Sequence, residues 1–255
     1  MKEAVMPRML FACLIFIICG FIPSYGQEII TARPDFTESP VTVPVGSIQI
    51  ETGAEYTRDN PASELSCPNA LVRMGLFEKL ECRIGFTGWT RLKEESRASR
   101  FYLNDIAVET KFRFTPSDAA IPIATVLLAS FPTGDSKLTS GTIDIGLKLA
   151  GSADFNDTFS LGANIGMIRT SIDDERRLWG LASVSLGIGL GERLDGFLEM
   201  YAEMPQKQSW QPMLDGGLTI LMTQVFQIDM YAGCGLNAHT PQFVMGAGCS
   251  FRFHP

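Results

Sequence analysis

The chain has 255 residues, of which 45% are hydrophobic and 19% are charged, and its formal net charge is −7. This length suits one domain, and the excess of acidic residues makes nucleic acid a poor candidate for a partner. Beyond the N-terminus there is no run of 18 or more apolar residues. A bundle of transmembrane helices is therefore not expected.

The N-terminus has the three parts of a secretory signal. Lys2 and Arg8 are followed by an apolar run over residues 9–22, and small residues stand at positions −3 and −1 relative to Gln27. The pattern predicts a signal peptide over residues 1–26 that is cleaved before Gln27. The alternative, a single transmembrane anchor, needs a longer apolar run.

The first mature segment, residues 27–47, contains three prolines and no hydrophobic periodicity. It is predicted to be irregular, because proline cannot donate to a strand ladder. Two interpretations stay open. In the first, the segment is functional and either enters the lumen or lies in the periplasm. In the second, it is a simple lead-in to the first strand.

From residue 48 onward, apolar and polar residues alternate with the period of two that marks β-strands. In residues 48–57, Ile48 and Ile50 share one face, and Glu51 and Glu55 share the other. Twelve runs of this kind are predicted, at roughly 48–57, 69–77, 80–89, 105–114, 120–131, 142–150, 156–168, 179–189, 193–204, 212–222, 224–236 and 242–253.

The connections between these runs alternate in length. Long, polar connections are predicted at 58–68, 90–104, 132–141, 169–178, 205–211 and 237–241, and short ones at about 78–79, 115–119, 151–155, 190–192 and 223. Outer-membrane barrels have long extracellular loops and short periplasmic turns. The sequence therefore predicts an all-β fold over residues 48–255, a transmembrane antiparallel up-and-down barrel of about 12 strands. A soluble sandwich would have no reason to alternate in this way.

The last run, residues 242–253, has a continuous apolar face that includes Phe243, Phe251 and Phe253. A chain that ends on such a strand resembles bacterial outer-membrane barrels, whose final strand carries the assembly signal. The resemblance implies that the barrel-assembly machinery and outer-membrane lipid are partners. Aromatic residues near predicted strand ends fit girdles at the two membrane interfaces; they are Trp89, Phe101, Tyr102, Trp179, Trp210 and Phe226.

Charged residues share one parity of the predicted strands, and charges that faced lipid would cost several kcal/mol each near the midplane. This face carries ten acids against six bases, which favours a polar lumen with a mild cation preference. The alternative is that opposite charges pair and close the lumen. The best candidates for lumen-facing, solute-facing residues are Glu51, Glu55, Arg83, Asp105, Glu109, Lys111 and Arg113.

No motif in the sequence indicates catalysis, a metal or a cofactor. The glycines of residues 187–191 lack the strand-to-helix context of a dinucleotide loop. An outer-membrane lipase would need a lipid-facing His and Ser pair, but His239 falls in a predicted outer loop. No cysteine or histidine pair has metal-ligand spacing. An enzyme is therefore not expected.

Three stretches resemble an outer-membrane barrel family of transporters that is linked to phenol meta-pathway degradation. They are Thr-Ala-Arg-Pro-Asp-Phe-Thr-Glu-Ser at residues 31–39 with the following Val-Pro-Val-Gly-Ser-Ile-Gln-Ile-Glu, Ser-Phe-Pro-Thr-Gly-Asp at 130–135, and Gly-Cys-Ser-Phe-Arg-Phe at 248–253. Members of this family usually carry an acidic residue where Ala32 stands. The resemblance implies a barrel with a transport role.

Together these patterns predict an outer-membrane channel for the passive passage of small solutes through a charged lumen. The solute itself is not indicated. The alternative is a closed barrel with a structural or ligand-binding role in the cell envelope.

Overall fold

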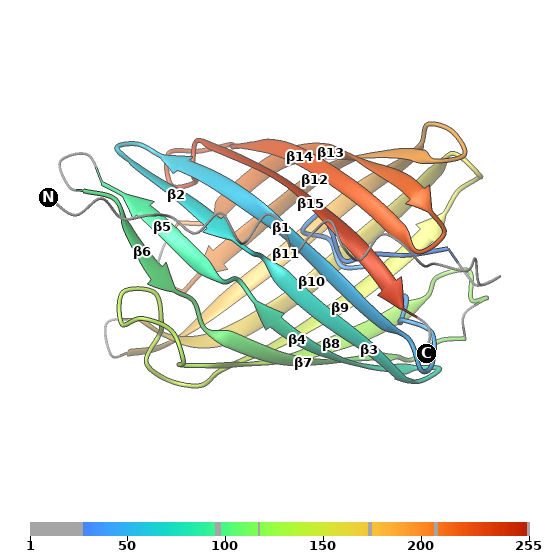
Figure 1. The fold of residues 1–255 in the computed structure, drawn as a ribbon, viewed down its shortest axis with the longest axis horizontal. Helices are drawn as coiled ribbons and strands as arrows, with labels where there is room; N and C mark the ends of the chain where they lie inside the picture. The colour runs from blue at the N-terminus through green and yellow to red at the C-terminus, as the bar shows by residue number, and fades with distance from the viewer. Residues whose placement is uncertain (1–27, 95–97, 117, 173–174, 207–208, 254–255) are drawn as a thin grey trace, which may run out of the picture.

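The computed structural model describes residues 28–94, 98–116, 118–172, 175–206 and 209–253 (Figure 1). The predicted signal peptide lies outside the described residues. Within the described ranges, no helix is long and apolar enough to cross a bilayer.

The chain after residue 47 forms one antiparallel sheet that curls into a barrel, as Figure 1 shows. Its strands are β1 (Ile48–Asp59), β2 (Ala62–Cys67), β3 (Ala70–Phe77), β4 (Leu80–Phe86), β5 (Trp89–Lys93), β6 (Arg100–Leu103), β7 (Ile106–Arg113), β8 (Ile123–Phe131), β9 (Asp144–Asp154), β10 (Phe159–Ile172), β11 (Glu175–Gly189), β12 (Leu194–Pro205), β13 (Gln211–Thr223), β14 (Phe226–Gly235) and β15 (Phe243–Phe253).

Three barrel strands are interrupted once, so these segments make up twelve strands. β2 continues into β3, β4 into β5 and β6 into β7, and the paired neighbours bridge each break. Pro68, which has no N–H for the ladder, lies in the first break. Gly88, in the break between β4 and β5, lies against Pro68. The Gly88 carbonyl accepts the N–H of Asn104, in the break between β6 and β7, at 2.9 Å. The predicted twelve-stranded antiparallel barrel is confirmed.

The first and last strands close the barrel. β1 pairs with β15 from Ile48 opposite Phe253 to Arg58 opposite Phe243. Among the described strands only the short β6 then has a neighbour on one side alone. Lipid requires such closure because it offers no partner for an unpaired N–H or C=O.

The two faces of the sheet have opposite chemistry. Large apolar side chains are exposed on the outside, for example Ile145 and Ile165, each 63% exposed. Charged side chains on the inside are buried, and Glu81 and Glu199 are 0% exposed. This inversion relative to a soluble protein suits lipid outside and a polar interior. The barrel is therefore of the type that spans the outer membrane.

Three of the connections predicted to be long are mostly strand. Residues 58–68 contain the end of β1 and all of β2, residues 90–104 contain most of β5 and all of β6, and β10 and β11 extend from both sides into 169–178. These extensions have no apolar alternation, because both of their faces meet water beyond the membrane. The backbone ladder continues there without it, with Ser171 opposite Arg176.

Candidate functional site

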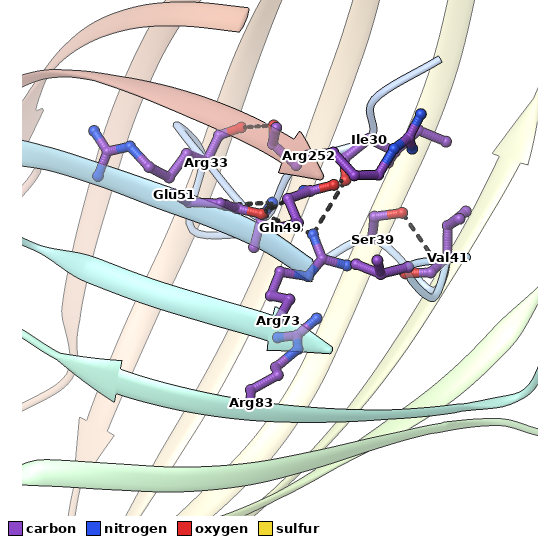
Figure 2. A network of polar contacts seen from close by, with 12 residues as sticks. Ile30, Arg33, Ser39, Val41, Gln49, Glu51, Arg73, Arg83 and Arg252 are labelled. Atoms are coloured by element: carbon purple, nitrogen blue, oxygen red, sulfur yellow. Dashed lines mark hydrogen bonds and ion pairs between the residues drawn. The ribbon is translucent and has the colours of Figure 1, made fainter. Parts of the chain in front are cut away.

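The N-terminal segment, residues 28–47, passes through the interior of the barrel (Figures 1 and 2). It begins near the turn between β13 and β14, where the Ile29 N–H donates to the Gln224 carbonyl at 2.9 Å. It ends beside β3, where the Gly46 N–H donates to the Gly75 carbonyl at 2.9 Å. Between these points it contacts strands on both sides of the lumen.

Arg33 of this segment binds the wall beside the β1–β15 closure. Its guanidinium donates from Nη2 to Asp229 Oδ1 at 3.1 Å and from Nε to Oδ2 at 3.3 Å. Gly53 and Gly248 lie opposite each other in the closing pair of strands. A Cβ on either glycine would come within 2.6 Å of the guanidinium. Both glycines therefore leave the room that Arg33 occupies.

A second set of contacts joins the segment to β1 and β3 (Figure 2). Glu51 accepts the Ala32 N–H at 2.9 and 3.1 Å and also binds Arg73 Nη1 at 2.8 Å. The same Arg73 nitrogen donates to the Ile30 carbonyl at 3.1 Å. Ala32 takes part through its backbone, so its lack of an acidic side chain does not weaken this contact.

Glu199 on β12 holds the tip of the segment. Its carboxylate accepts the N–H groups of Phe36 and Thr37, each at 2.7 Å, and the Thr37 hydroxyl. The Phe36 ring stacks on Tyr201 with centroids 4.5 Å apart. Backbone N–H groups that point at one carboxylate give strong, directional bonds, and the Glu199 side chain that accepts them is fully buried.

Glu38 anchors the segment to the opposite wall. Its carboxylate binds the Arg83 guanidinium at 2.7 and 2.9 Å and Lys111 Nζ at 2.6 Å. Burial acts to raise the pKa of Glu38, but the charges of Arg83 and Lys111 outweigh it and hold the pKa well below its ordinary value. Glu38 therefore stays ionised inside the barrel.

Asp35 lies at the same tip but in a less favourable environment. Burial and the nearby Glu199 carboxylate raise the pKa of Asp35 well above its ordinary value. The charged form of Glu38 thus stabilises the position of the segment in the lumen. The charged form of Asp35 destabilises that position.

The segment separates two cavities. The outer cavity has a volume of about 790 Å³ and is lined by Ala32, Arg33 and residues of the outer half of the wall. The inner cavity has about 660 Å³ and lies between residues 28–41 of the segment and the periplasmic ends of the strands. Both are large enough for a small solute.

The seven predicted lumen residues fall into two groups in the structure. Glu51, Arg83 and Lys111 are buried and bind the N-terminal segment directly. Glu109 reaches Arg83 at 3.4 Å and lines the outer cavity.

The other three lie apart from the segment. Glu55 accepts the Tyr231 hydroxyl. Asp105 accepts the Gly134 N–H at 2.8 Å and the Thr139 hydroxyl at 2.9 Å, and so holds the connection between β8 and β9 over the outer cavity. Arg113 donates to the Glu78 carbonyl at 3.1 Å at a periplasmic turn.

Trp179 was predicted to lie in an interface girdle, and the structure places it elsewhere. It lines the outer cavity, while its neighbour Leu178 is 43% exposed on the outside. Because β11 extends beyond the predicted run, Trp179 is not at a strand end. Trp89 and Phe101 are 51% and 68% exposed, as girdle residues would be.

Sequence periodicity missed the residues of the segment that fill the lumen, above all Arg33, Phe36 and Glu38. They lie in an irregular stretch, where no parity assigns a side chain to a face. The available signal was chemical: a mixed-charge, proline-containing segment directly before a strand whose inward face is charged. Among the described residues, no group of three or more His, Cys, Asp or Glu side chains is placed to hold a metal ion.

Solved structures with the same architecture are outer-membrane channels. The outer-membrane channel from Pseudomonas putida F1 has a TM-score of 0.61 and 12% identity, covering 84% of this chain and 98% of that one. The NanC porin has a TM-score of 0.59 and 12% identity, covering 79% and 98%. The KdgM porin has a TM-score of 0.58 and 10% identity, covering 81% and 99%. At these identities the similarity concerns the fold.

No curated protein matches the chain in sequence. A family model described as "Putative MetA-pathway of phenol degradation" matches residues 31–253, from within the N-terminal segment to the end of β15. The match covers nearly the whole described chain and agrees with the motifs at residues 31–39, 130–135 and 248–253. This chain belongs to that family of outer-membrane barrels.

Proposed function

We propose that this protein is a passive outer-membrane channel for small solutes, in which the N-terminal segment sets the width of the path. The chain would be exported by the signal peptide of residues 1–26 and inserted by the barrel-assembly machinery through its final strand. Glu51, Glu55, Arg83, Asp105, Glu109, Lys111 and Arg113 would supply the charged wall of the lumen. No residue is assigned to catalysis and no cofactor is required.

One observation carries this proposal: a polar segment separates two cavities within one closed barrel. The segment is held by hydrogen bonds and ion pairs, and the solute-sized spaces lie on either side of it. A barrel that served only as a scaffold would gain more stability from an apolar filling, because buried ion pairs contribute little net free energy.

The test is single-channel conductance of the refolded mature chain in a planar bilayer with a salt gradient across it. We expect a small, steady current whose reversal potential indicates cation preference, because acids outnumber bases on the lumen wall. Replacing Glu109 and Glu203 by Gln should weaken this preference, because both line the outer cavity. Glu192→Gln, at an exposed periplasmic turn, is the matched control.

Heat-modifiable electrophoretic mobility shows that each variant has folded as a barrel before its current is measured. The absence of current from a folded, inserted barrel would contradict the proposal. It would favour the second candidate, a closed barrel that binds a ligand, which the many contacts of the segment support.

A further inference from the structure

The outer cavity has walls of two kinds. Leu71, Leu128, Ile168, Trp179 and Leu181 form apolar and aromatic surface, and the Arg33–Asp229 pair lies at the inner end. A volume of about 790 Å³ with mixed walls is typical of a small-molecule site. The connection between β8 and β9, held by Asp105, contributes Leu138 and Thr139 to the outer side.

The charges that line this cavity are strongly unbalanced. Its lining has five acids, Glu51, Asp105, Glu109, Asp144 and Glu203, and one base, Arg33. The base is already paired with Asp229 at 3.1 Å. Three of the acids have arginine partners, at 2.8, 3.4 and 3.7 Å.

Asp105 and Glu203 have no basic partner within ion-pair distance among the described residues. Asp105 accepts bonds from the neighbouring connection. Glu203 forms neither a hydrogen bond nor an ion pair with any residue that the structure describes, and Lys148, whose charge acts on it, is not among the residues that line the cavity. Asp105 and Glu203 are therefore the two carboxylates of this lining that have no ion-pair partner among the described residues.

The strand register puts aromatic surface next to the Glu203 carboxylate. Glu203 on β12 lies opposite Leu181 on β11, and Trp179 is two residues along on the same face. Neighbours in this diagonal position lie within reach of long or aromatic side chains. A carboxylate beside an indole ring is the pair of groups that recognises an organic ammonium ion, by charge and by cation–π attraction.

Two further atoms at the walls lack a partner. Asn69 Oδ1 and Trp179 Nε1 are buried and form no hydrogen bond with the described residues, and both residues line the cavity. Buried polar groups are nearly always satisfied in folded proteins. Of the two, Asn69 Oδ1 fits an ammonium ion, because it can accept an ammonium N–H, whereas the Trp179 indole N–H is a donor and needs an acceptor such as water.

We propose that the outer cavity is a binding site for small organic ammonium ions with an apolar body, with Glu203 as counter-ion and Trp179 as the ring that covers the cation. This inference deepens the proposed channel function by naming the class of solute. An anion of the same shape would be repelled by Glu203 and Asp105. A neutral molecule would leave the Glu203 charge unpaired.

The test is isothermal titration of the refolded mature barrel in detergent with benzylammonium, and with benzoate and benzyl alcohol as anionic and neutral analogues. We expect benzylammonium to bind and benzoate not to bind. Glu203→Gln should weaken benzylammonium binding about ten-fold or more, and Trp179→Leu should weaken it several-fold. Glu192→Gln removes the same charge at the periplasmic end and should leave binding unchanged. Heat-modifiable mobility checks that each variant is folded.

Equal affinity of the wild type and Glu203→Gln, or binding of benzoate as tight as that of benzylammonium, would overturn the site. So would the absence of benzylammonium binding to the folded wild type. Binding and conductance are measured separately, so the two proposals can fail separately. Binding without current supports the site and contradicts the channel, and current without binding does the reverse.

Discussion

Individual lumen residues act here mainly as partners of the N-terminal segment. Arg83 and Lys111 converge on Glu38, and three donors of the segment converge on Glu199. Removing Glu38 would leave the buried Lys111 ammonium without its carboxylate partner, and breaking a buried ion pair typically costs about 3–5 kcal/mol. The charges of this lumen thus determine where the segment lies before they act on a solute.

Asp35 gives a pH dependence whose sign follows from its raised pKa. Inside the barrel its carboxyl holds a proton more tightly than it would in water. The protonated Asp35 carboxyl therefore stabilises the folded barrel below its ordinary pKa of 3.8. This stabilisation is lost as the pH rises through the raised pKa that Asp35 has in the fold. Asp35→Asn should stabilise the barrel against urea at about pH 8 and have much less effect at about pH 4.

The measurement for Asp35→Asn is the free energy of unfolding in detergent at each pH, with Glu28→Gln as a control. A stabilisation of the same size at both pH values would show that charge at Asp35 is not the cause.

At the scale of single elements, each strand divides its residues between lipid and lumen. β9 shows this clearly, with Leu147 and Leu149 outside and Lys148 between them on the lumen face. Its neighbours keep the same register, with Leu147 opposite Leu127 on β8 and Met167 on β10. A charge at the outward position would have to enter the hydrocarbon.

Leu147→Arg should therefore destabilise the folded barrel in lipid by about 2–4 kcal/mol, the cost of arginine near the bilayer midplane. Leu147→Ala is the matched control, because it removes the side chain without adding charge. Urea titration in liposomes measures both variants. Equal losses for the two would mean that this position does not face lipid.

At the scale of the whole molecule, the barrel and the segment are held by different forces. The barrel is closed by backbone pairing of β1 with β15, and the segment is held by side chains of many strands. We therefore expect the barrel wall to fold without the segment, because no pairing between its strands depends on it.

Deleting residues 28–41 should leave a folded barrel with a larger single-channel conductance, because the two cavities would join. Adding a synthetic peptide of residues 28–41 should reduce the conductance again, and a peptide of reversed sequence should not. An unchanged conductance after the deletion would mean that the segment does not limit the path.

The sequence by itself determined the barrel. Alternation such as that of Ile48 and Ile50 against Glu51 and Glu55 depends only on the period of a strand, so it shows which face meets lipid and how many times the chain crosses. Strand ends were less certain, because at residues 58–68 and 169–178 both faces meet water and the alternation disappears although the pairing continues.

Only the tertiary structure decided what the inward charges bind. Glu38 and Arg83 are far apart in sequence, and Glu199 is farther still, so no local pattern links them. The alternation of residues along a strand could place Arg83 and Glu199 inside the barrel. An irregular segment has no such alternation, so the sequence could not place the side chains of residues 28–47. The position of residues 28–47 follows from the summed contacts of strands that meet only once the barrel has closed. That closure also creates the outer cavity around Glu203 and Trp179.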